Sequence, residues 1–119
     1  MIQSAEEMIR QYVAAWNEQN LAGYTAAFSR CWAVEGAYTD PNYALVKGVD
    51  GIAELAAVSL EKQPKRVFHV LTAPDCHHHC GRYTWSVELP AGTKEGFDFF
   101  EYNGEYKITR LVSFFGPLQ

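Results

Sequence analysis

The spacing of the apolar residues changes near Pro64, and this change limits the folds that the chain can adopt. Before Pro64 the apolar residues recur three and four positions apart, which is typical of amphipathic helices. Three such helices are predicted, and the residues on their inward faces are Ile9, Tyr12, Val13 and Trp16, then Leu21, Tyr24, Thr25 and Phe28, then Ile52, Leu55, Ala56 and Ser59. Ser4, with Glu7 three residues later, predicts the start of the first helix, and Asp50 predicts the start of the third.

Beyond Pro64 the pattern is that of β-strands. Residues 82–89 alternate between two faces, and the apolar face carries Tyr83, Trp85, Val87 and Leu89. Further strands are predicted over residues 67–71, 96–102 and 107–115. A short strand over residues 36–39 is expected to end at the turn Asp40-Pro41-Asn42. Helices followed by strands indicate an α+β fold, with three N-terminal helices packed on a curved antiparallel sheet, in one domain of residues 1–119.

The composition argues against several classes of protein. Hydrophobic residues make up 48% of the 119 residues and aromatic residues 14%, which is more than a disordered chain or a coiled coil carries. The net charge is -4 and the ten Lys and Arg residues are scattered, so we expect no nucleic-acid partner. The apolar runs are far shorter than the roughly 20 residues that cross a bilayer, so we expect no membrane. The absence of a leader pattern and the odd number of cysteines favour a reduced, cytoplasmic setting.

Asp98 is unusual for its position in the sequence. It lies within Phe97-Asp98-Phe99-Phe100, in a predicted strand, where Asp is disfavoured because its carboxylate resists burial. By alternation it shares a face with Phe100 and Tyr102. If that face lines a cavity, the loss of water raises the carboxyl pKa and can keep the group protonated as a hydrogen-bond donor. The alternative is an aspartate on the solvent side of the sheet.

Asp40 and Tyr12 each have an ordinary interpretation and a functional one. Asp40 precedes Pro41 at the end of a predicted strand, which is typical of a turn. Tyr12 lies on the apolar face of the first helix, which is typical of a core tyrosine whose hydroxyl finds a partner. Either residue could instead contribute its polar group to a site.

Several short motifs follow one another along the chain. They are Gln-Tyr-Val-Ala-Ala-Trp-Asn at residues 11–17 with Leu21, Tyr24 and Phe28 behind it, Asp40-Pro41, the Lys-Gly-Val-Asp-Gly-Ile segment at residues 47–52, and the strand segments 83–88, 96–100 and 111–116. In this order they resemble the NTF2-like superfamily, particularly its SnoaL-like and ketosteroid-isomerase members. The resemblance covers nearly the whole chain, and it implies a cone with a pocket between helices and sheet, assembled as a homodimer.

The resemblance also implies roles for three residues. Tyr12, Asp40 and Asp98 occupy the positions of the catalytic residues in ketosteroid isomerases. Asp40 would act as the general base that moves a proton next to a carbonyl, and Tyr12 with protonated Asp98 would form an oxyanion hole. The expected ligand is a small, largely apolar carbonyl compound, and no cofactor is implied. We expect the pocket to be lined in addition by Trp16, Phe28, Tyr83, Trp85, Phe100 and Phe114.

Two other functions remain open. The chain could be a non-catalytic ligand-binding or dimerisation module with the same pocket, because this fold hosts many activities. It could also be a dehydratase or a hydrolase. Relatives of that kind carry an Arg or His in the pocket, whereas Arg82 is predicted on the face opposite Tyr83. His69 is interpreted as an ordinary sheet histidine.

The segment Cys76-His77-His78-His79-Cys80 contains residue types that bind zinc. In an extended strand, alternate residues face opposite ways, so at most three of the five can converge. We therefore expect no metal site there and interpret the segment as the exposed start of a strand.

Overall fold

The computed structural model describes residues 1–116, and its helices are α1 (Ala5–Ala15), α2 (Leu21–Cys31) and α3 (Gly48–Lys62). The Ser4 hydroxyl accepts a hydrogen bond from the Glu7 backbone N–H at 3.1 Å, which confirms the predicted start of α1. The third helix begins two residues before the predicted Asp50. Gly48 has a φ of 77°, and this left-handed conformation lets the chain turn from a strand directly into the helix. No helix of the described chain is long and apolar enough to cross a membrane.

Seven strands form one sheet. They are β1 (Trp32–Asp40), β2 (Tyr43–Lys47), β3 (Val67–Val70), β4 (Asp75–His77), β5 (Cys80–Leu89), β6 (Gly92–Tyr102) and β7 (Ile108–Phe115). The order across the sheet is β2-β1-β7-β6-β5-β3, and β4 pairs with β5 outside this path. All pairs are antiparallel except β1 with β7, which is parallel. The predicted α+β architecture is confirmed, with one parallel pair in an otherwise antiparallel sheet.

The strands differ from the prediction at both ends of the sheet. β1 begins at Trp32, immediately after α2 and four residues before the predicted start. β2 and β4 were not predicted. They have only five and three residues, and partly or fully exposed side chains along their whole length leave no alternation of buried and exposed positions that a sequence pattern could show.

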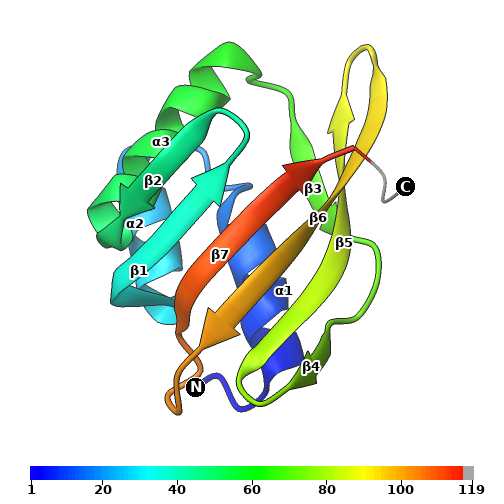
Figure 1. Ribbon diagram of the computed structural model, residues 1–119. Coiled ribbons are helices and arrows are strands. Elements are labelled where there is room, and N and C mark those ends of the chain that lie inside the picture. The colour runs from blue at the N-terminus through cyan, green and yellow to red at the C-terminus, as the bar shows by residue number, and fades with distance from the viewer. Residues whose placement is uncertain (117–119) are drawn as a thin grey trace.

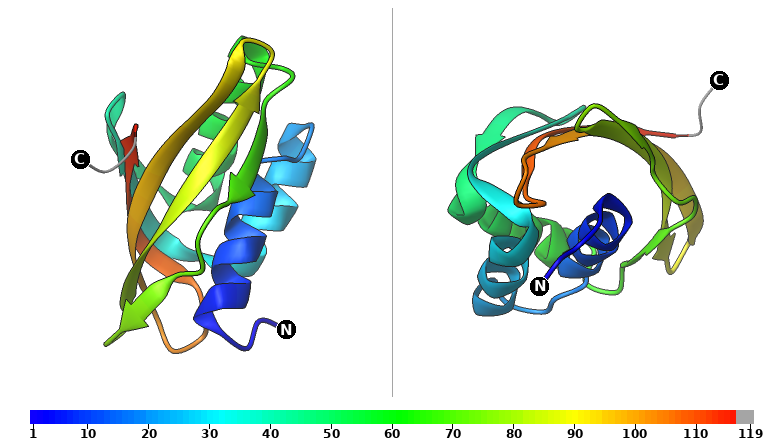
Figure 2. Two further views of the ribbon diagram at one scale, coloured as in Figure 1. Left: turned by 90° about the vertical axis from the view of Figure 1, so that its right-hand side faces the viewer. Right: turned by 90° about the horizontal axis from the view of Figure 1, so that it is seen from below.

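The sheet curves around the helices. Seen from below, it forms an arc with α1 on its inner side, while α2 and α3 lie near the end of the arc formed by β1 and β2 (Figure 2). β7 and β6 occupy the middle of the sheet and run side by side across the front of the molecule (Figure 1). The inner faces of these central strands therefore point toward the helices.

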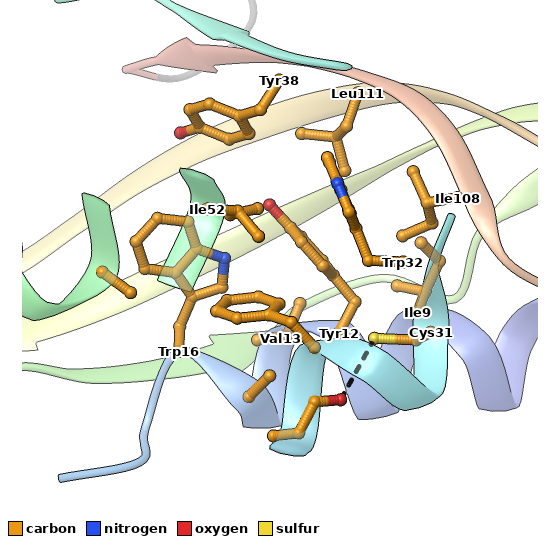
Figure 3. Packing of buried hydrophobic residues seen from close by; sticks show 14 of the residues in the cluster. Ile9, Tyr12, Val13, Trp16, Cys31, Trp32, Tyr38, Ile52, Ile108 and Leu111 are labelled. Atoms are coloured by element: carbon orange, nitrogen blue, oxygen red, sulfur yellow. Dashed lines mark hydrogen bonds between the residues drawn. The ribbon is translucent and has the colours of Figure 1, made fainter. Parts of the chain in front are cut away.

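Aromatic rings fill the space between α1, α2 and the start of β1. The Tyr12 ring stacks on Trp32 with a centroid distance of 5.6 Å, and it contacts Phe28 at 5.9 Å. Phe28 in turn contacts Trp16 edge-on at 5.7 Å. Figure 3 shows Tyr12 rising from α1 beside Trp32, with its hydroxyl on the side of the molecule where Tyr38 lies. This packing fixes the direction of the Tyr12 side chain.

Candidate functional site

A cavity of about 710 Å³ is enclosed by residues of α1 and α3 and by residues of the sheet. Its walls come from α1, α3 and from six strands, β1, β2, β3, β5, β6 and β7, so most of the fold contributes to it. The volume is within the range of small-molecule sites. The lining includes the three residues for which the sequence suggested catalytic roles, Tyr12, Asp40 and Asp98.

Asp98 is the buried acid of this cavity, with 3% of its surface exposed. It lies in the middle of β6, directly opposite Tyr83 on β5 and Ser113 on β7. The Tyr83 hydroxyl donates to Asp98 Oδ2, and the Trp85 indole N–H donates to Oδ1 at 2.8 Å. The Ser113 side chain, which is also buried, lies beside the group from β7. The carboxyl group is therefore held on both oxygens by the neighbouring strand β5.

The pKa of Asp98 reflects two opposing effects. Burial raises it from 3.8 to about 6, because the charged form loses its hydration. Ser113 and the hydrogen bonds from Tyr83 and Trp85 favour the charged form and limit this rise in pKa, while the negative charge of Asp40 adds to it. A group that titrates near 6 can exchange its proton at physiological pH.

Gly96 explains how Trp85 reaches Asp98. It is paired with Trp85 across β5 and β6, and the indole ring lies directly over it. A Cβ atom at Gly96 would overlap that ring and the carbonyl of Phe114. The ring is further held by edge contacts with Phe68 at 5.9 Å and Phe115 at 6.0 Å. The absence of a side chain at Gly96 thus lets the indole N–H reach a carboxyl group two residues along the same strand.

Tyr12 supplies a neutral hydroxyl to the cavity. Burial is the main cause that raises its pKa well above 10, and the negative charge of Asp98 raises it further. Trp16 lowers the pKa of Tyr12. Its indole N–H can only donate a hydrogen bond, so Trp16 does not accept the Tyr12 proton. Among the hydrogen bonds of residues 1–116, none uses the Tyr12 proton, so this proton can be donated to a ligand.

Asp40 combines the two interpretations that the sequence left open. Its Oδ1 accepts from the backbone N–H groups of Asn42 at 2.8 Å and Tyr43 at 2.9 Å, which forms the turn between β1 and β2. Its Oδ2 accepts from the Tyr38 hydroxyl at 2.8 Å. The residue is half-buried and lines the cavity. Asp40 is a turn residue whose carboxylate also faces the site.

The predicted pocket residues fall into three groups. Trp16 and Trp85 line the cavity, and Tyr83 is buried behind Asp98 as its hydrogen-bond donor. Phe28 and Phe100 are not part of the lining. Both are fully buried: Phe28 packs between α1 and α2, and Phe100 packs beside Tyr83, so their rings belong to the core.

The prediction for Phe114 is wrong. Its side chain is 44% exposed and stacks on Phe97, its cross-strand partner, at 4.8 Å. The alternation of β7 places Ser113 and Phe115 on the cavity side, so the residue between them faces outward. A shift of one position in a strand moves a side chain to the other face of the sheet.

Sequence reasoning missed Arg66, which is buried and lines the cavity. It follows Pro64 and Lys65 in a polar stretch that is typical of an exposed connection, so no sequence signal indicates its burial. Tyr38 and Ser113 were also missed as site residues. Their positions follow from the register of β1 and β7, which the sequence pattern did not specify.

The Cys76–Cys80 segment lies away from the cavity, in the β4–β5 hairpin. His78 and His79 form its turn with φ values of 49° and 62°. Within residues 1–116, no three His, Cys, Asp or Glu side chains are arranged to hold a metal ion. Arg82 and His69 also lie outside the cavity lining, and they pair with Asp75 and Glu88 at 3.4 Å and 3.5 Å.

The sequence matches no protein-family model and no curated protein. Solved structures, in contrast, share the whole architecture. A candidate isomerase of the SnoaL-like family from Agrobacterium tumefaciens superimposes with a TM-score of 0.85 and 27% sequence identity, over 97% of this chain and 100% of the other. A protein with a ketosteroid-isomerase-like fold from Catenulispora acidiphila, in complex with trimethylamine, has a TM-score of 0.76 and 15% identity over 95% and 88% of the two chains.

A candidate ketosteroid isomerase from Kribbella flavida is similar over 97% of this chain and 79% of its own length, with a TM-score of 0.71 and 14% identity. These similarities establish the class: the chain has the NTF2-like fold, with three helices on a curved sheet around a cavity. Within this class, the resemblance to SnoaL-like and ketosteroid-isomerase-like proteins that the sequence motifs suggested is confirmed at the level of structure.

The raised pKa of Asp98 predicts a specific dependence of stability on pH. Because the pKa is higher in the folded state, the stabilising contribution of the protonated form is complete below 3.8 and is lost as the pH rises through about 6. Asn is neutral at every pH, so the variant Asp98→Asn does not lose stability in this way as the pH rises. The free energy of unfolding of Asp98→Asn minus that of the wild type should therefore increase by about 3 kcal/mol at most over this range.

Urea unfolding at about pH 4.5 and about pH 7.5 measures this difference. The control is Asp75→Asn, which changes an exposed aspartate in the same way. A difference between Asp98→Asn and the wild type that does not change with pH would show that the Asp98 carboxyl titrates as an ordinary aspartate.

Proposed function

We propose that the protein is a small-molecule enzyme of the ketosteroid-isomerase or polyketide-cyclase type, which moves a proton next to a carbonyl in an apolar cavity. The observation that carries this proposal is the buried Asp98, with a pKa of about 6, in the same cavity as the unused proton of Tyr12. The 27% identity with a candidate isomerase of the SnoaL-like family supports it.

In this proposal Asp40 is the base. Its carboxylate is kept in place by the Tyr38 hydroxyl and by the turn N–H groups, so that it faces the cavity in one orientation. It would take a proton from the carbon next to the carbonyl of the ligand. A positioned base of this kind contributes roughly 10²–10⁴-fold to the rate.

Tyr12 and protonated Asp98 would stabilise the resulting enolate by donating hydrogen bonds to its oxygen. A carboxyl group has about four lone-pair positions, and the hydrogen bonds from Tyr83 and Trp85 occupy two of them. The group therefore retains a position for a proton that faces the ligand. A bound apolar ligand displaces water and raises the pKa further, so ligand binding should be coupled to proton uptake by Asp98.

Dehydratase or hydrolase chemistry is the second candidate. The observation that favours it is Arg66, because relatives of that kind carry an Arg or His in the pocket and this residue lines the cavity. A non-catalytic ligand-binding module would use the same cavity without dependence on Asp40.

We also propose a homodimer formed by the outer face of the sheet. Phe97 and Phe114 stack on that face with their rings nearly parallel, at an angle of 8°. Leu45 on β2 is 58% exposed. Large apolar side chains gathered on one face of a sheet are typical of an interaction surface.

We also propose a location in the cytoplasm. The three cysteines are free thiols, which supports this location.

Fluorescent naphthols test the proposed oxyanion hole, because their emission distinguishes the neutral from the ionised phenol. The wild type should bind 2-naphthol with emission from the ionised form. Tyr12→Phe removes one donor to a charged oxygen and should weaken binding about tenfold or more. Tyr102→Phe makes the same change outside the cavity and should bind as the wild type does. Binding of the neutral naphthol alone, with equal affinity in Tyr12→Phe, would favour the non-catalytic module.

Light scattering tests the proposed dimer at micromolar concentration. The wild type should have twice the chain mass of 13.4 kDa. Phe114→Lys places a charge on the proposed interface and should give monomers, whereas Leu71→Lys, at an exposed leucine in the connection after β3, should remain dimeric. A wild type that has the mass of one chain would contradict the proposed dimer.

A further inference from the structure

Arg66 is a buried cation in the wall of the cavity, with 3% of its surface exposed. Its Nε donates to the Ser59 hydroxyl at 2.9 Å, and its Nη1 donates to the Trp16 carbonyl at 3.0 Å. Its Nη2 donates to the Tyr24 hydroxyl at 3.2 Å and to the Ala56 carbonyl at 3.1 Å. All four partners are uncharged.

Among the ion pairs of residues 1–116, none involves Arg66. Buried charges are normally paired, because leaving water is costly for an ion. The Trp16 carbonyl lies at the C-terminal end of α1, where the helix dipole supplies only a partial negative charge. The guanidinium has five N–H donors, and the four hydrogen bonds leave one of them, on Nη1, without a partner. An anion in the cavity would supply the missing charge.

A second cation lies on the same side of the cavity. Lys62, in the last turn of α3, is exposed and lines the cavity, and no acidic residue from α3 or from residues 63–66 is part of the lining. Asp40, Glu95 and Asp98 lie on the sheet side, together with one cation, Lys94. The cavity therefore has a cationic helix side and a mainly acidic sheet side, and one ligand could contact both.

We propose that the natural ligand is a carbonyl compound that also carries a carboxylate, and that this carboxylate faces Arg66 and Lys62 while the carbonyl faces Tyr12 and Asp98. The inference rests on the proposed function for the carbonyl end and adds the class of substrate, a small carbonyl acid. Arginine is well suited to a carboxylate partner, since its guanidinium remains charged and is weakly hydrated.

The test compares the dissociation constants of 2-naphthol and 6-hydroxy-2-naphthoate, which differ by one carboxylate. The wild type should bind the naphthoate about tenfold more tightly, at low ionic strength and near pH 7. Lys62→Met should reduce this preference and Arg66→Met should abolish it. Arg66→Lys keeps the charge and should retain most of the preference. Lys65→Met, which removes an exposed neighbouring cation outside the cavity lining, should leave it unchanged.

Circular dichroism checks that each variant is folded, because Arg66 contacts all three helices. If Arg66→Met does not fold, Lys62→Met and Arg66→Lys decide the question. Equal affinity of the wild type for the two ligands would overturn the inference. The inference would also be overturned if Lys62→Met lost affinity for both ligands by the same factor. If the wild type does not prefer the naphthoate while the binding of 2-naphthol still depends on Tyr12, only the proposed carboxylate site is wrong. If neither ligand binds, the proposed function fails as well.

Discussion

The cost of placing the Asp98 carboxyl inside an apolar sheet determines the geometry of the site. An isolated carboxylate would not remain charged at this position, and hydrogen bonds from Tyr83 and Trp85, with Ser113 beside the group, reduce the cost. These three side chains come from the strands on either side of β6. The site therefore exists only when β5, β6 and β7 pair in their observed register, since a slip of one residue would turn Asp98 to the outer face.

The helices contribute the opposite wall, and the connection between α3 and β3 contributes a second buried charge. Arg66 joins the end of α1 to α2 and α3 through its contacts with Trp16, Tyr24 and Ala56. The stacking of Tyr12 on Trp32 sets the position of a buried hydroxyl that lines the cavity and whose proton is not used within the described chain. Packing and polar chemistry are thus coupled, because the same aromatic residues that build the core also aim the polar groups.

The sequence predicted those parts of the structure that depend on local periodicity. The alternation around Asp98 correctly placed this residue on one face with Phe100, and both are buried, while the helical spacing correctly placed Tyr12 toward the core. Phe114 was misplaced because it lies one position from the cavity-facing residues of β7, and in a largely apolar strand the pattern alone does not distinguish the two faces. Arg66 was missed because its burial depends on acceptors that are 7 to 50 residues away in the sequence.

The incorporation of solvent deuterium into enolisable ketones is the most direct test of proton transfer in this cavity. Nuclear magnetic resonance would follow the exchange in D₂O for ketones that bind the protein. At ketone concentrations far below saturation, the account predicts exchange next to the carbonyl with a rate that falls as the pH rises past about 6, because Asp98 of the unliganded protein then loses its proton. Asp40→Asn should fold and bind but lower the rate by roughly 10²–10⁴-fold. Exchange at an unchanged rate in Asp40→Asn, or no exchange for any ketone that binds, would contradict it.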